Sequence, residues 1–365
     1  MSTRGTTLRL ATRGSDLALR QAAMVKEALE TRRRSVELIE VETTGDQIRD
    51  ELIHRLGKTG AFVRTLDEKV LDGDLDAAVH SLKDVPTDQP DELVVAGVPD
   101  RAAAGDLLVT PDGQTLDDLP EGATVGTSSL RRGAQLRAER PDLNIEPLRG
   151  NVDTRVQKLL APDLQREHEA RSEAEKERKE KVDDQDYEHP YDRTVEKWFE
   201  GLAEIERLAL ERDVETEFDA IVLAAAGLDR IGLRHHVQTV ELDPERFVPA
   251  PGQGTIAVTA LDGETATEIN EAIDHPPTRV ATTVERTVLA TLGGGCIAPI
   301  GVHAALQGST VRTVARVLSR DGTEEVSATR DLPVHRHPEA AREFAEDLRE
   351  QGAAELIDQA VDDDD

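Results

Sequence analysis

Four short segments of the chain place arginine near the start of a predicted helix, directly after an apolar run and a turn of small residues. The first turn of a helix offers free backbone N–H groups and partial positive charge, and Arg adds a planar, two-pronged donor that suits a carboxylate. A single such Arg more often belongs to a surface ion pair, but repetition indicates a ligand with several carboxylates or phosphates. The segments are LATRGSDLA (10–18), VGTSSLRRGAQL (125–136), PLRGNVDTRVQKL (147–159) and LAAAGLDRIGL (223–233), with Arg13, Arg131, Arg132, Arg149, Arg155 and Arg230.

A second candidate for chemistry is HSLKDVPT (80–87), which begins where a predicted strand ends. It brings Ser81, Lys83 and Asp84 to that strand end. A carboxylate held between cations and a wall of low polarity can exchange a proton or stabilise a positive intermediate. An Asp before a proline-bearing turn more commonly caps the turn, and the residues alone leave both interpretations open. His80 by itself is interpreted as structural.

The third candidate is Cys296 in LGGGCIAPIG (292–301), the only cysteine of the chain. A single thiol excludes an intrachain disulfide and a metal site made of cysteines alone. A lone Cys is usually a small buried hydrophobic residue. Three preceding glycines permit a close backbone approach, however, so an accessible thiolate acting as nucleophile or attachment point is the alternative.

The acidic balance of the chain limits its partners. It carries 74 acidic against 44 basic residues, a net charge of −30, and only 9 of the bases are Lys. This composition, with 2% aromatic residues, is typical of proteins from concentrated salt, and an ordinary acidic mesophilic enzyme is the alternative. Nucleic acid is not expected as a partner because phosphate neutralisation needs a basic face. A nucleotide is disfavoured because no Walker loop or dinucleotide glycine pattern occurs.

Expectations about the location and oligomeric state of the protein rest on sequence signals that are absent. No run of 18 apolar residues occurs, so we expect no membrane contact. The N-terminal MSTRGTTLRLATRGS lacks the apolar stretch of a secretory signal, so we expect a cytoplasmic protein. Oligomeric state has no marker in the sequence, and a monomer is the default expectation.

The elements that must position these residues alternate between strand and helix patterns. This rhythm predicts mostly parallel sheets with helices on both faces, and ligands bind at the carboxyl ends of such strands. Ser15 is the predicted N-cap of the first helix. In the first series, strands are predicted at 8–11, 35–44, 75–80 and 93–98, and helices at 16–30 and 62–71; in the second, strands at 107–110, 124–126 and 144–148, and helices at 130–140 and 152–160.

Two later regions break this rhythm. Residues 163–217 hold 20 acids and 10 bases, and their first part is predicted to be a solvated, mobile charge run. Their second part is predicted to be one docked helix with an apolar stripe of Val195, Trp198, Phe199, Leu202, Ile205 and Leu208. A strand and helix are predicted at 218–233, followed by a Pro/Gly-rich crossover at 248–254. The chain then predicts a smaller α+β unit, with helices at 280–292 and 338–351 and strands at 302–306, 311–318 and 324–332.

Taken together and in order, these motifs resemble the hydroxymethylbilane synthase family, also called porphobilinogen deaminases. The resemblance covers nearly the whole chain except residues 163–217. The matching segments are LRLATRGSDLALRQA (8–22), GAFVRTLDEKVLDGDLDAAVHSLKDVPT (60–87), VGTSSLRRGAQL (125–136), LRGNVDTRVQKL (148–159), DAIVLAAAGLDRIGL (219–233), PAPGQG (249–254) and ERTVLATLGGGCIAPIG (285–301).

The resemblance implies an α/β fold: two doubly wound lobes resembling type II periplasmic binding proteins, plus a small C-terminal α+β domain. It places domain 1 at residues 1–103 and 254–273, domain 2 at 104–249 with an acidic insertion at about 163–217, and domain 3 at 274–365. It also implies a reaction in which four porphobilinogen molecules join head to tail, ammonia leaves at each step, and linear hydroxymethylbilane results.

The resemblance further implies a dipyrromethane cofactor joined by a thioether to Cys296, with Asp84 as catalytic acid. The implied contacts to cofactor and substrate are Arg13, Ser15, Ser81, Lys83, Thr127, Ser128, Ser129, Arg131, Arg132, Arg149, Gly150, Arg155, Arg230 and Gln253, and no metal is implied. Many members have Lys directly before the Gly of the loop that precedes Phe62. Here Thr59 stands there, so Lys58, with Phe62, is kept as a candidate of an active-site loop.

The insertion is the second departure from the family. It is interpreted as a solvated adaptation to salt, with a cover over the cleft or a contact to the first domain as alternatives. A two-lobed carboxylate-binding protein without chemistry is the alternative function, because it would need the arginines but neither Asp84 nor Cys296.

Overall fold

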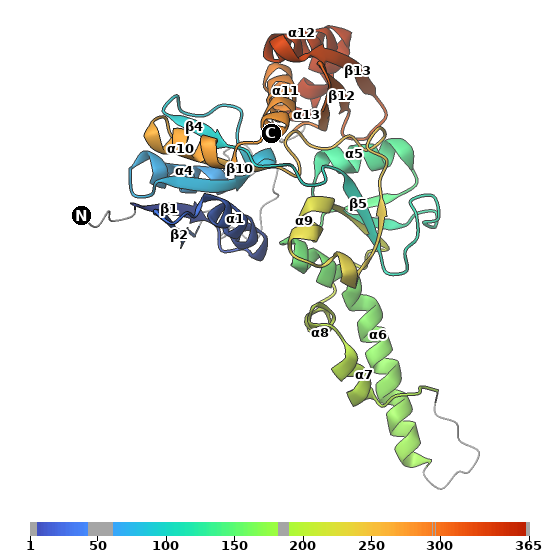
Figure 1. Ribbon diagram of the computed structural model, residues 1–365. Helices are drawn as coiled ribbons and strands as arrows, with labels where there is room; N and C mark the ends of the chain where they lie inside the picture. Colours follow the sequence, from blue (N-terminus) through green and yellow to red (C-terminus); the bar gives the residue numbers. More distant parts are fainter. Residues whose placement is uncertain (1–5, 43–60, 182–189, 294, 296, 363–365) are drawn as a thin grey trace.

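The computed structural model describes residues 6–42, 61–181, 190–293, 295 and 297–362. Three sheets organise these residues, and Figure 1 shows them in three parts of the molecule. The first lobe holds a five-stranded sheet in the order β2-β1-β3-β10-β4, and the second lobe holds one in the order β7-β6-β8-β5-β9. The C-terminal unit holds the three-stranded sheet β11-β12-β13. The expected two α/β lobes and smaller α+β unit are therefore confirmed, while the predicted domain boundaries stay a prediction.

The first lobe sandwiches its sheet between helices. Leu8 and Leu10 of β1 point to the face covered by α1 and α10, whereas Ala11 of β1 and Ala78 of β3 point to the face covered by α4. This alternation follows from the period of two along a strand. The elements are β1 (Thr6–Thr12), α1 (Asp16–Leu29), β2 (Arg34–Glu40), α4 (Ala61–Leu71), β3 (Ala77–Ser81), β4 (Leu93–Gly97), β10 (Ile256–Leu261) and α10 (Glu264–Ile273).

The second lobe repeats this layering. Leu107 and Val109 of β5 pack toward α6, α8 and α9, while Leu108 between them packs toward α5. The elements are β5 (Asp106–Thr110), β6 (Thr124–Gly126), α5 (Leu130–Glu139), β7 (Asn144–Glu146), α6 (Val152–Glu180), α7 (Val195–Gly201), α8 (Glu204–Leu210), β8 (Ala220–Ala224), α9 (Ala225–Arg230) and β9 (Gln238–Glu241).

Each lobe contains one strand that runs against the others, and it is the strand by which the chain enters from the other lobe. β10 is antiparallel to β3 and β4, while β1 pairs in parallel with β2 and β3. β5 is antiparallel to β8 and β9, while β6 pairs in parallel with β7 and β8. The prediction of mostly parallel sheets is confirmed. Because the chain leaves and re-enters at the carboxyl ends of the strands, both crossovers lie at the edge where ligands bind.

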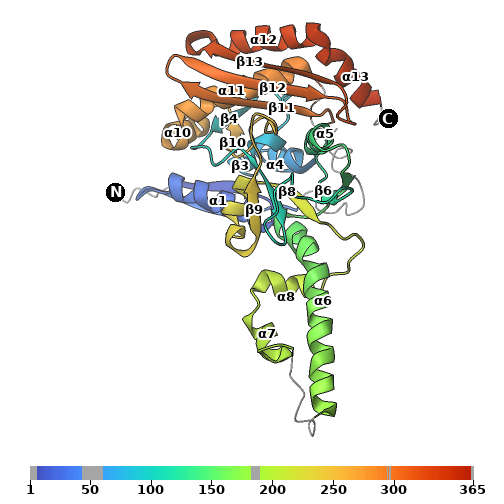
Figure 2. The ribbon, with the colours of Figure 1, turned by 90° about the vertical axis from the view of Figure 1, so that its right-hand side faces the viewer.

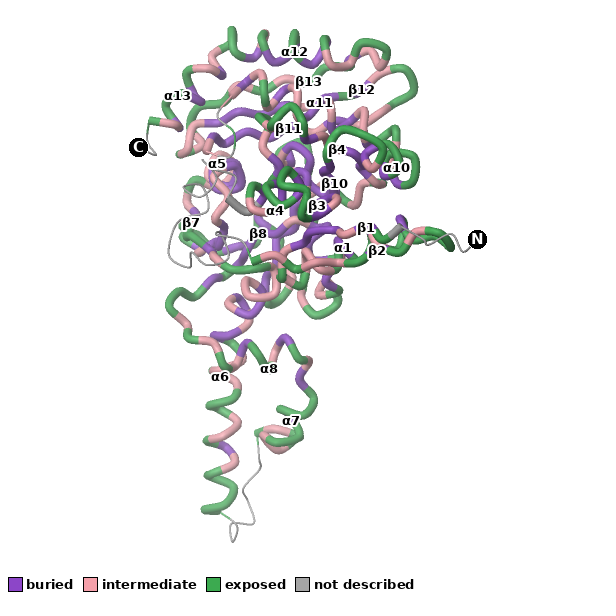
Figure 3. The backbone as a smooth tube through the Cα atoms, turned by 90° about the vertical axis from the view of Figure 1, so that its left-hand side faces the viewer, coloured by how far each residue is buried: buried purple, intermediate pink, exposed green. Residues whose placement is uncertain are grey.

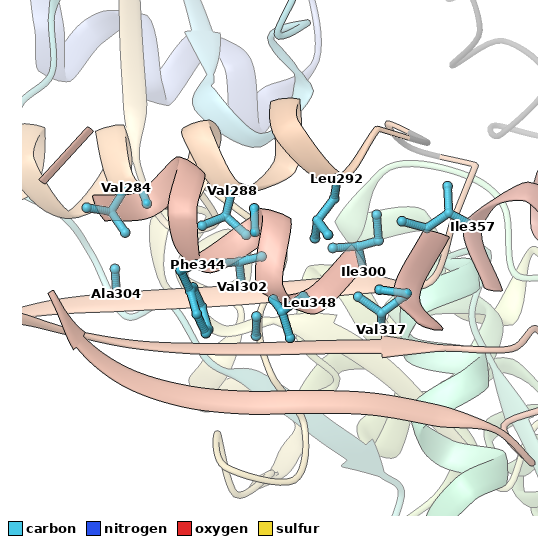
Figure 4. Close-up of a cluster of buried hydrophobic side chains, with 14 of the residues drawn as sticks. Val284, Val288, Leu292, Ile300, Val302, Ala304, Val317, Phe344, Leu348 and Ile357 are labelled. Atoms are coloured by element: carbon cyan, nitrogen blue, oxygen red, sulfur yellow. The ribbon is translucent and has the colours of Figure 1, made fainter. Parts of the chain in front are cut away.

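The C-terminal unit packs helices on one face of its sheet (Figure 4). Val284, Val288 and Leu292 of α11 lie against Ile300 of β11 and Phe344 of α12, and these side chains are buried. The spacing of the α11 residues gives one apolar stripe, as expected for a helix that covers a sheet. The elements are α11 (Pro276–Leu292), β11 (Ile300–Gln307), β12 (Thr310–Leu318), β13 (Glu325–Pro333), α12 (His337–Leu348) and α13 (Ala354–Asp362).

The predicted insertion is not a mobile charge run up to residue 181. α6 continues as one helix of 29 residues and, with α7 and α8, forms an arm that projects from the second lobe (Figure 2). The charge run is helical because opposite charges fall one turn apart: Arg171 Nη2 lies 2.7 Å from Glu167 Oε1, and Arg178 pairs with Glu175. Figure 3 shows that the outer part of α6 is mostly exposed or intermediate.

The prediction of one docked helix with a continuous stripe is also wrong. The chain is extended at Leu202, and a hydrogen bond from Ala203 N to Glu206 Oε2 (2.7 Å) starts a second helix there. Trp198, Leu202 and Ile205 are buried, whereas Phe199 is 42% exposed. Leu208 is exposed as well, so the break turns part of the stripe to solvent. The arm points away from the first lobe in both ribbon views, which disfavours a cover over the cleft (Figures 1 and 2).

Candidate functional site

The turn that carries Asp84 lies at the carboxyl end of β3 and is held by the crossover from the second lobe. Leu82 N donates to Thr255 O at 2.9 Å. Gly252, with a φ of +76°, leaves no room for a side chain, because a Cβ there would lie 3.0 Å from Leu82 Cγ and 3.2 Å from Lys83 N. The crossover therefore packs directly against the turn. On this turn the side chain of Asp84 is exposed and that of Lys83 is half-buried.

Arg131 and Arg132 lie on the first turn of α5 but do not face open solvent. The carboxylate of Asp106 binds both: its Oδ2 lies 2.7 Å from Arg131 Nη2, and its Oδ1 lies 2.7 Å from Arg132 Nη2. Gln253 of the crossover donates to the same Oδ1 at 2.8 Å. Burial favours the neutral acid, but the two guanidinium groups outweigh it and hold the pKa of Asp106 well below its usual range. Each arginine thus has a buried protein partner, Asp106. Their contact with a ligand stays a prediction.

Lys83 of the first lobe lies close enough to Arg132 and Arg155 of the second lobe to be repelled by their charges. Burial lowers the pKa of its ammonium group, and the nearby positive charges of Arg132 and Arg155 lower it further, against the opposing effect of Asp84. Lys83 and Asp84 belong to the first lobe, while Arg132 and Arg155 belong to the second. The structure thus brings together the two motifs that the sequence singled out separately.

Two cations of the second lobe, Arg155 and Arg230, form no ion pair with any described residue. Burial, and then the charge of Arg132, lowers the pKa of Arg155 to about 10. Burial lowers the pKa of Arg230, whose Nη2 donates to Gly254 O at 2.7 Å. The Nε atoms of Arg230 and Arg131 are buried and have no hydrogen-bond partner among the described residues. Buried donors of this kind are costly, and carboxylates would satisfy them.

The smaller polar residues mostly build the helix starts. Ser15 caps α1 by accepting from Ala18 N, and Ser129 caps α5 by accepting from Arg132 N. The Ser15 cap confirms that part of the sequence prediction. Thr127 Oγ1 accepts from Ser129 N at 3.2 Å, and Ser128 Oγ donates to Leu148 O at 2.7 Å.

The other predicted contacts lie at the same strand ends. Arg13 follows β1, Arg149 and Gly150 precede α6, and Ser81 ends β3; the side chains of Arg13, Arg149 and Ser81 are half-buried. Gly150 has a φ of +112° and exposes its carbonyl, which accepts from Arg155 Nε at 2.8 Å. His80 is buried and bonds Asp67 Oδ1 at 2.9 Å through Nε2, which confirms its structural interpretation.

Two predicted site residues, Lys58 and Cys296, lie outside the described residues. For Phe62 the structure describes only the backbone, in the first turn of α4. The flanks of the cysteine loop are described: α11 ends at Leu292, and β11 begins at Ile300. The loop thus starts and ends on the C-terminal unit.

Three residues whose ion pairs hold the crossover, Arg101, Glu285 and Asp106, escaped the sequence analysis. Arg101 forms a two-pronged pair with Glu285, at 2.7 Å and 3.1 Å, and its Nε donates to Gln253 O. Glu285 also accepts from Gly252 N and Ala304 N, so one buried carboxylate joins the crossover to β11. A signal existed for Glu285, because it stands within the apolar stripe of α11, and for Asp106, because it opens an otherwise apolar strand.

The described residues offer neither a metal site nor a membrane span. No group of three or more His, Cys, Asp and Glu side chains among them could hold a metal ion. None of the described helices combines the length and apolar character that crossing a membrane requires.

Two family models match the chain. One, described as porphobilinogen deaminase, dipyromethane cofactor binding domain, matches residues 8–169 and 205–269. The other, described as porphobilinogen deaminase, C-terminal domain, matches residues 280–351. The stretch between residues 169 and 205, which falls within the arm, is outside both matches.

Curated proteins of similar sequence bear the same family name. A probable porphobilinogen deaminase of Halobacterium salinarum is 52% identical, over 97% of this chain and 98% of that protein. A probable porphobilinogen deaminase of Methanococcoides burtonii is 36% identical over 96% of both chains. A porphobilinogen deaminase of Syntrophobacter fumaroxidans is also 36% identical over 96% of both.

Similarity to solved structures is weaker. A TRAP periplasmic solute binding protein from Desulfovibrio salexigens aligns with a TM-score of 0.35 and 11% identity, over 73% of this chain and 72% of that one. A marine metagenome TRAP solute binding protein aligns with a TM-score of 0.32 and 10% identity, over 98% of both. Scores this low carry no conclusion about this chain.

Proposed function

Because the chain belongs to the porphobilinogen deaminase family, we propose a division of roles among its residues for that family's reaction. The chain is a transferase of tetrapyrrole biosynthesis. It joins four porphobilinogen molecules head to tail, releases ammonia at each addition and produces hydroxymethylbilane. The halophilic interpretation of its net charge of −30 is supported by its relative in Halobacterium salinarum.

The cofactor of this family, dipyrromethane, fits the cationic strand ends. Each of its pyrrole rings carries carboxylate side chains. The buried Nε donors of Arg131 and Arg230 have no partner among the described residues, so carboxylates could accept from them. Burial, together with repulsion from neighbouring arginines, lowers the pKa values of Lys83 and Arg155, and bound carboxylates would relieve that repulsion. When bound, the dipyrromethane supplies the free pyrrole carbon to which the first porphobilinogen is added.

The proposed attachment point is Cys296, through a thioether. The described flanks of its loop support this role, because α11 and β11 both belong to the C-terminal unit and Glu285 of α11 ties them to the crossover at Gly252. The glycines before Cys296 carry no side chain that would hinder the approach of the loop to the cationic strand ends.

Asp84 is proposed as the catalytic residue. Porphobilinogen loses its amino group as ammonia, and positive charge develops on the pyrrole as the C–N bond breaks. An exposed carboxyl group at the end of β3 can give a proton to the leaving amine and, once ionised, stabilise that charge. Lys83, beside it on the same turn, places a positive charge close to the Asp84 side chain.

The remaining predicted residues are proposed to hold the growing chain. Arg230 is assigned to a carboxylate because its buried Nε has no partner among the described residues. Arg155 is assigned to one because its charge is desolvated and is repelled by Arg132. Arg131 and Arg132 are held in place by their ion pairs with Asp106. We assign them to orienting the bound cofactor and substrate. The other proposed contacts are Arg13, Ser15, Ser81, Thr127, Ser128, Ser129, Arg149, Gly150 and Gln253, with Lys58 and Phe62 from the adjoining loop.

The finer statements about assembly and domains are proposals too. The protein is proposed to act as a monomer without nucleic acid, with domains at 1–103 with 254–273, 104–249, and 274–365. A carboxylate-binding protein without catalysis is not favoured, because all three relatives named above bear the name of the enzyme.

The observation that carries the proposal is the arrangement at the crossover, where Gly252 packs against Lys83 and the neighbouring Gln253 accepts from Arg132 Nη2 at 3.4 Å. The turn of Asp84 thus lies close to the arginines of the second lobe. Intact mass of the purified protein tests it together with porphobilinogen consumption. We expect an excess mass of two pyrrole units, absent from a Cys296→Ser variant, and at least about a hundredfold loss of turnover in Asp84→Asn. Unmodified mass in active protein would refute the role of Cys296, and near-normal turnover of Asp84→Asn would refute that of Asp84.

A further inference from the structure

Arg286 of α11 contacts the turn that carries Lys83 and Asp84. Its Nη1 donates to Val85 O at 2.8 Å and to Leu82 O at 3.4 Å, and its Nη2 donates to Pro86 O at 2.8 Å. The three carbonyls lie on both sides of Asp84. One planar guanidinium therefore fixes the turn from the side of the C-terminal unit.

The partners of Arg286 are unusual for a buried cation. Burial lowers the pKa of its guanidinium group, and no carboxylate of the described residues forms an ion pair with it. By contrast, Arg101 pairs with Glu285, and Arg279, also on α11, pairs with Asp274 at 2.6 Å. Burying the Arg286 guanidinium without a carboxylate partner costs stability. We therefore infer that its hydrogen bonds to the backbone carbonyls serve to fix the geometry of the turn.

The turn is held between two neighbouring residues of one helix. Glu285 accepts from Gly252 N at 2.7 Å, and Gly252 packs against Leu82 and Lys83. Arg286 binds the carbonyls of the same turn. α11 also leads into the loop of Cys296, so the helix whose side chains hold the turn of Asp84 precedes the proposed attachment point in the chain.

We propose that Arg286 is a positioning residue, which sets the place of the Asp84 carboxylate relative to the C-terminal unit. The proposal rests on the function proposed above. Its physical basis is that general acid–base catalysis depends on geometry, and a misplacement of about 1 Å can reduce the rate about a hundredfold. Substrate carboxylates are bound by other residues, so affinity is not what Arg286 supplies.

The test compares Arg286→Ala and Arg286→Lys with Arg279→Ala. Arg279 is a matched control: it lies two turns earlier on α11, borders the same cavity of about 280 Å³, and donates to Val95 O and Ala96 O of the first lobe. Those carbonyls belong to β4, which carries no predicted site residue. Each protein is measured in molar KCl for kcat and KM with porphobilinogen, for thermal unfolding, and for cofactor content by intact mass.

We expect Arg286→Ala to keep its two-pyrrole excess mass and to lose about ten- to hundredfold in kcat, with KM within about twofold of wild type. The kcat of Arg286→Lys should lie between those of wild type and Arg286→Ala, because one ammonium group cannot bind three carbonyls equally well. Arg279→Ala should unfold at a comparably lowered temperature yet keep its kcat. Millimolar guanidinium, entering through the cavity beside Arg286, should restore part of the turnover of Arg286→Ala and none in Arg279→Ala, with equal potassium as the salt control.

Three results would overturn the proposal. They are equal kcat losses in Arg286→Ala and Arg279→Ala, a rise in KM alone, and guanidinium acting on both variants or on neither. A wild-type protein without dipyrromethane and without porphobilinogen consumption would instead refute the proposed function, and the role of Arg286 with it.

Discussion

The carboxylate of Asp106 lies 2.7 Å from Nη2 of Arg132, and the side chains are 0% and 6% exposed. Arg131 binds the other carboxylate oxygen at the same distance. This buried carboxylate therefore holds two neighbouring arginines at the start of α5, while Gln253 brings the crossover to the same point. The contact fixes the second lobe and its crossover before any ligand is bound.

Asp106→Asn should strongly destabilise the fold, because it leaves two buried guanidinium groups without their counter-charge. We expect a loss of about 3–5 kcal/mol in the free energy of unfolding, measured by urea denaturation in molar KCl. Asp16→Asn, which removes the exposed partner of Arg20, is the control and should cost less than about 1 kcal/mol. Equal losses in the two variants would contradict the structural role of Asp106.

The same pair predicts a sensitivity to acid. The pKa of Asp106 is lowered in the folded state, so its contribution to stability is complete above its ordinary value of 3.8 and is lost as the pH falls below it. Asp106→Asn should therefore unfold with a shallower pH dependence between pH 5 and about pH 2 than wild type. Urea midpoints across that range measure the difference, and parallel curves would contradict it.

Arg155 predicts a dependence of the same sign in alkali, because its pKa is also lowered in the folded state. Its folded pKa of about 10 lies below the ordinary value of 12.5, so native wild type releases a proton before the unfolded chain does. Wild-type stability relative to Arg155→Met should therefore rise as the pH increases through about 10. Urea unfolding at pH 8 and pH 11 measures this difference, and a constant difference would contradict the desolvated position of Arg155. The same variant should bind porphobilinogen more weakly at pH 8.

Salt should increase both stability and activity. A net charge of −30 repels a carboxylate-bearing substrate and strains the compact fold, and the Debye length falls from about 10 Å at 0.1 M to about 3 Å at 1 M salt. We therefore expect kcat/KM and the thermal midpoint to rise from 0.1 M to molar KCl. The stability loss in Asp106→Asn should change little over this range, since the pair is buried. Activity that is flat or falls with salt would contradict the halophilic interpretation.

The arm should be dispensable for catalysis. Residues 170–204 lie outside the family match and include no predicted site residue, so replacing them with a short Gly/Ser linker should leave kcat and KM within about twofold. Trp198 is the only tryptophan, and Arg171 stacks on it with its guanidinium carbon 5.3 Å from the ring centroid. Its fluorescence should therefore not change when porphobilinogen binds. A large loss of activity or a shift in emission would place the arm at the site.

Much of the fold was predictable because its signals are local. The helix over α1 and its Ser15 cap, the strand over β6 and the three strands of the C-terminal unit all follow from periodicity within a few residues. Expectations failed in the arm, where the same charge pattern suits a solvated chain or a helix with paired charges. The ion pair of Arg171 with Glu167 favours the helix.

The sequence by itself determined which residue types are available: arginines at four strand ends, one carboxylate beside Lys83, one cysteine, and a strongly acidic surface. Only the tertiary structure decided how they are shared. It paired Arg131 and Arg132 with Asp106, left the Nε atoms of Arg131 and Arg230 without a partner among the described residues, and brought Arg286 onto the turn of Asp84. These pairings join residues about 20 to 200 positions apart in the chain, and no local pattern encodes such contacts.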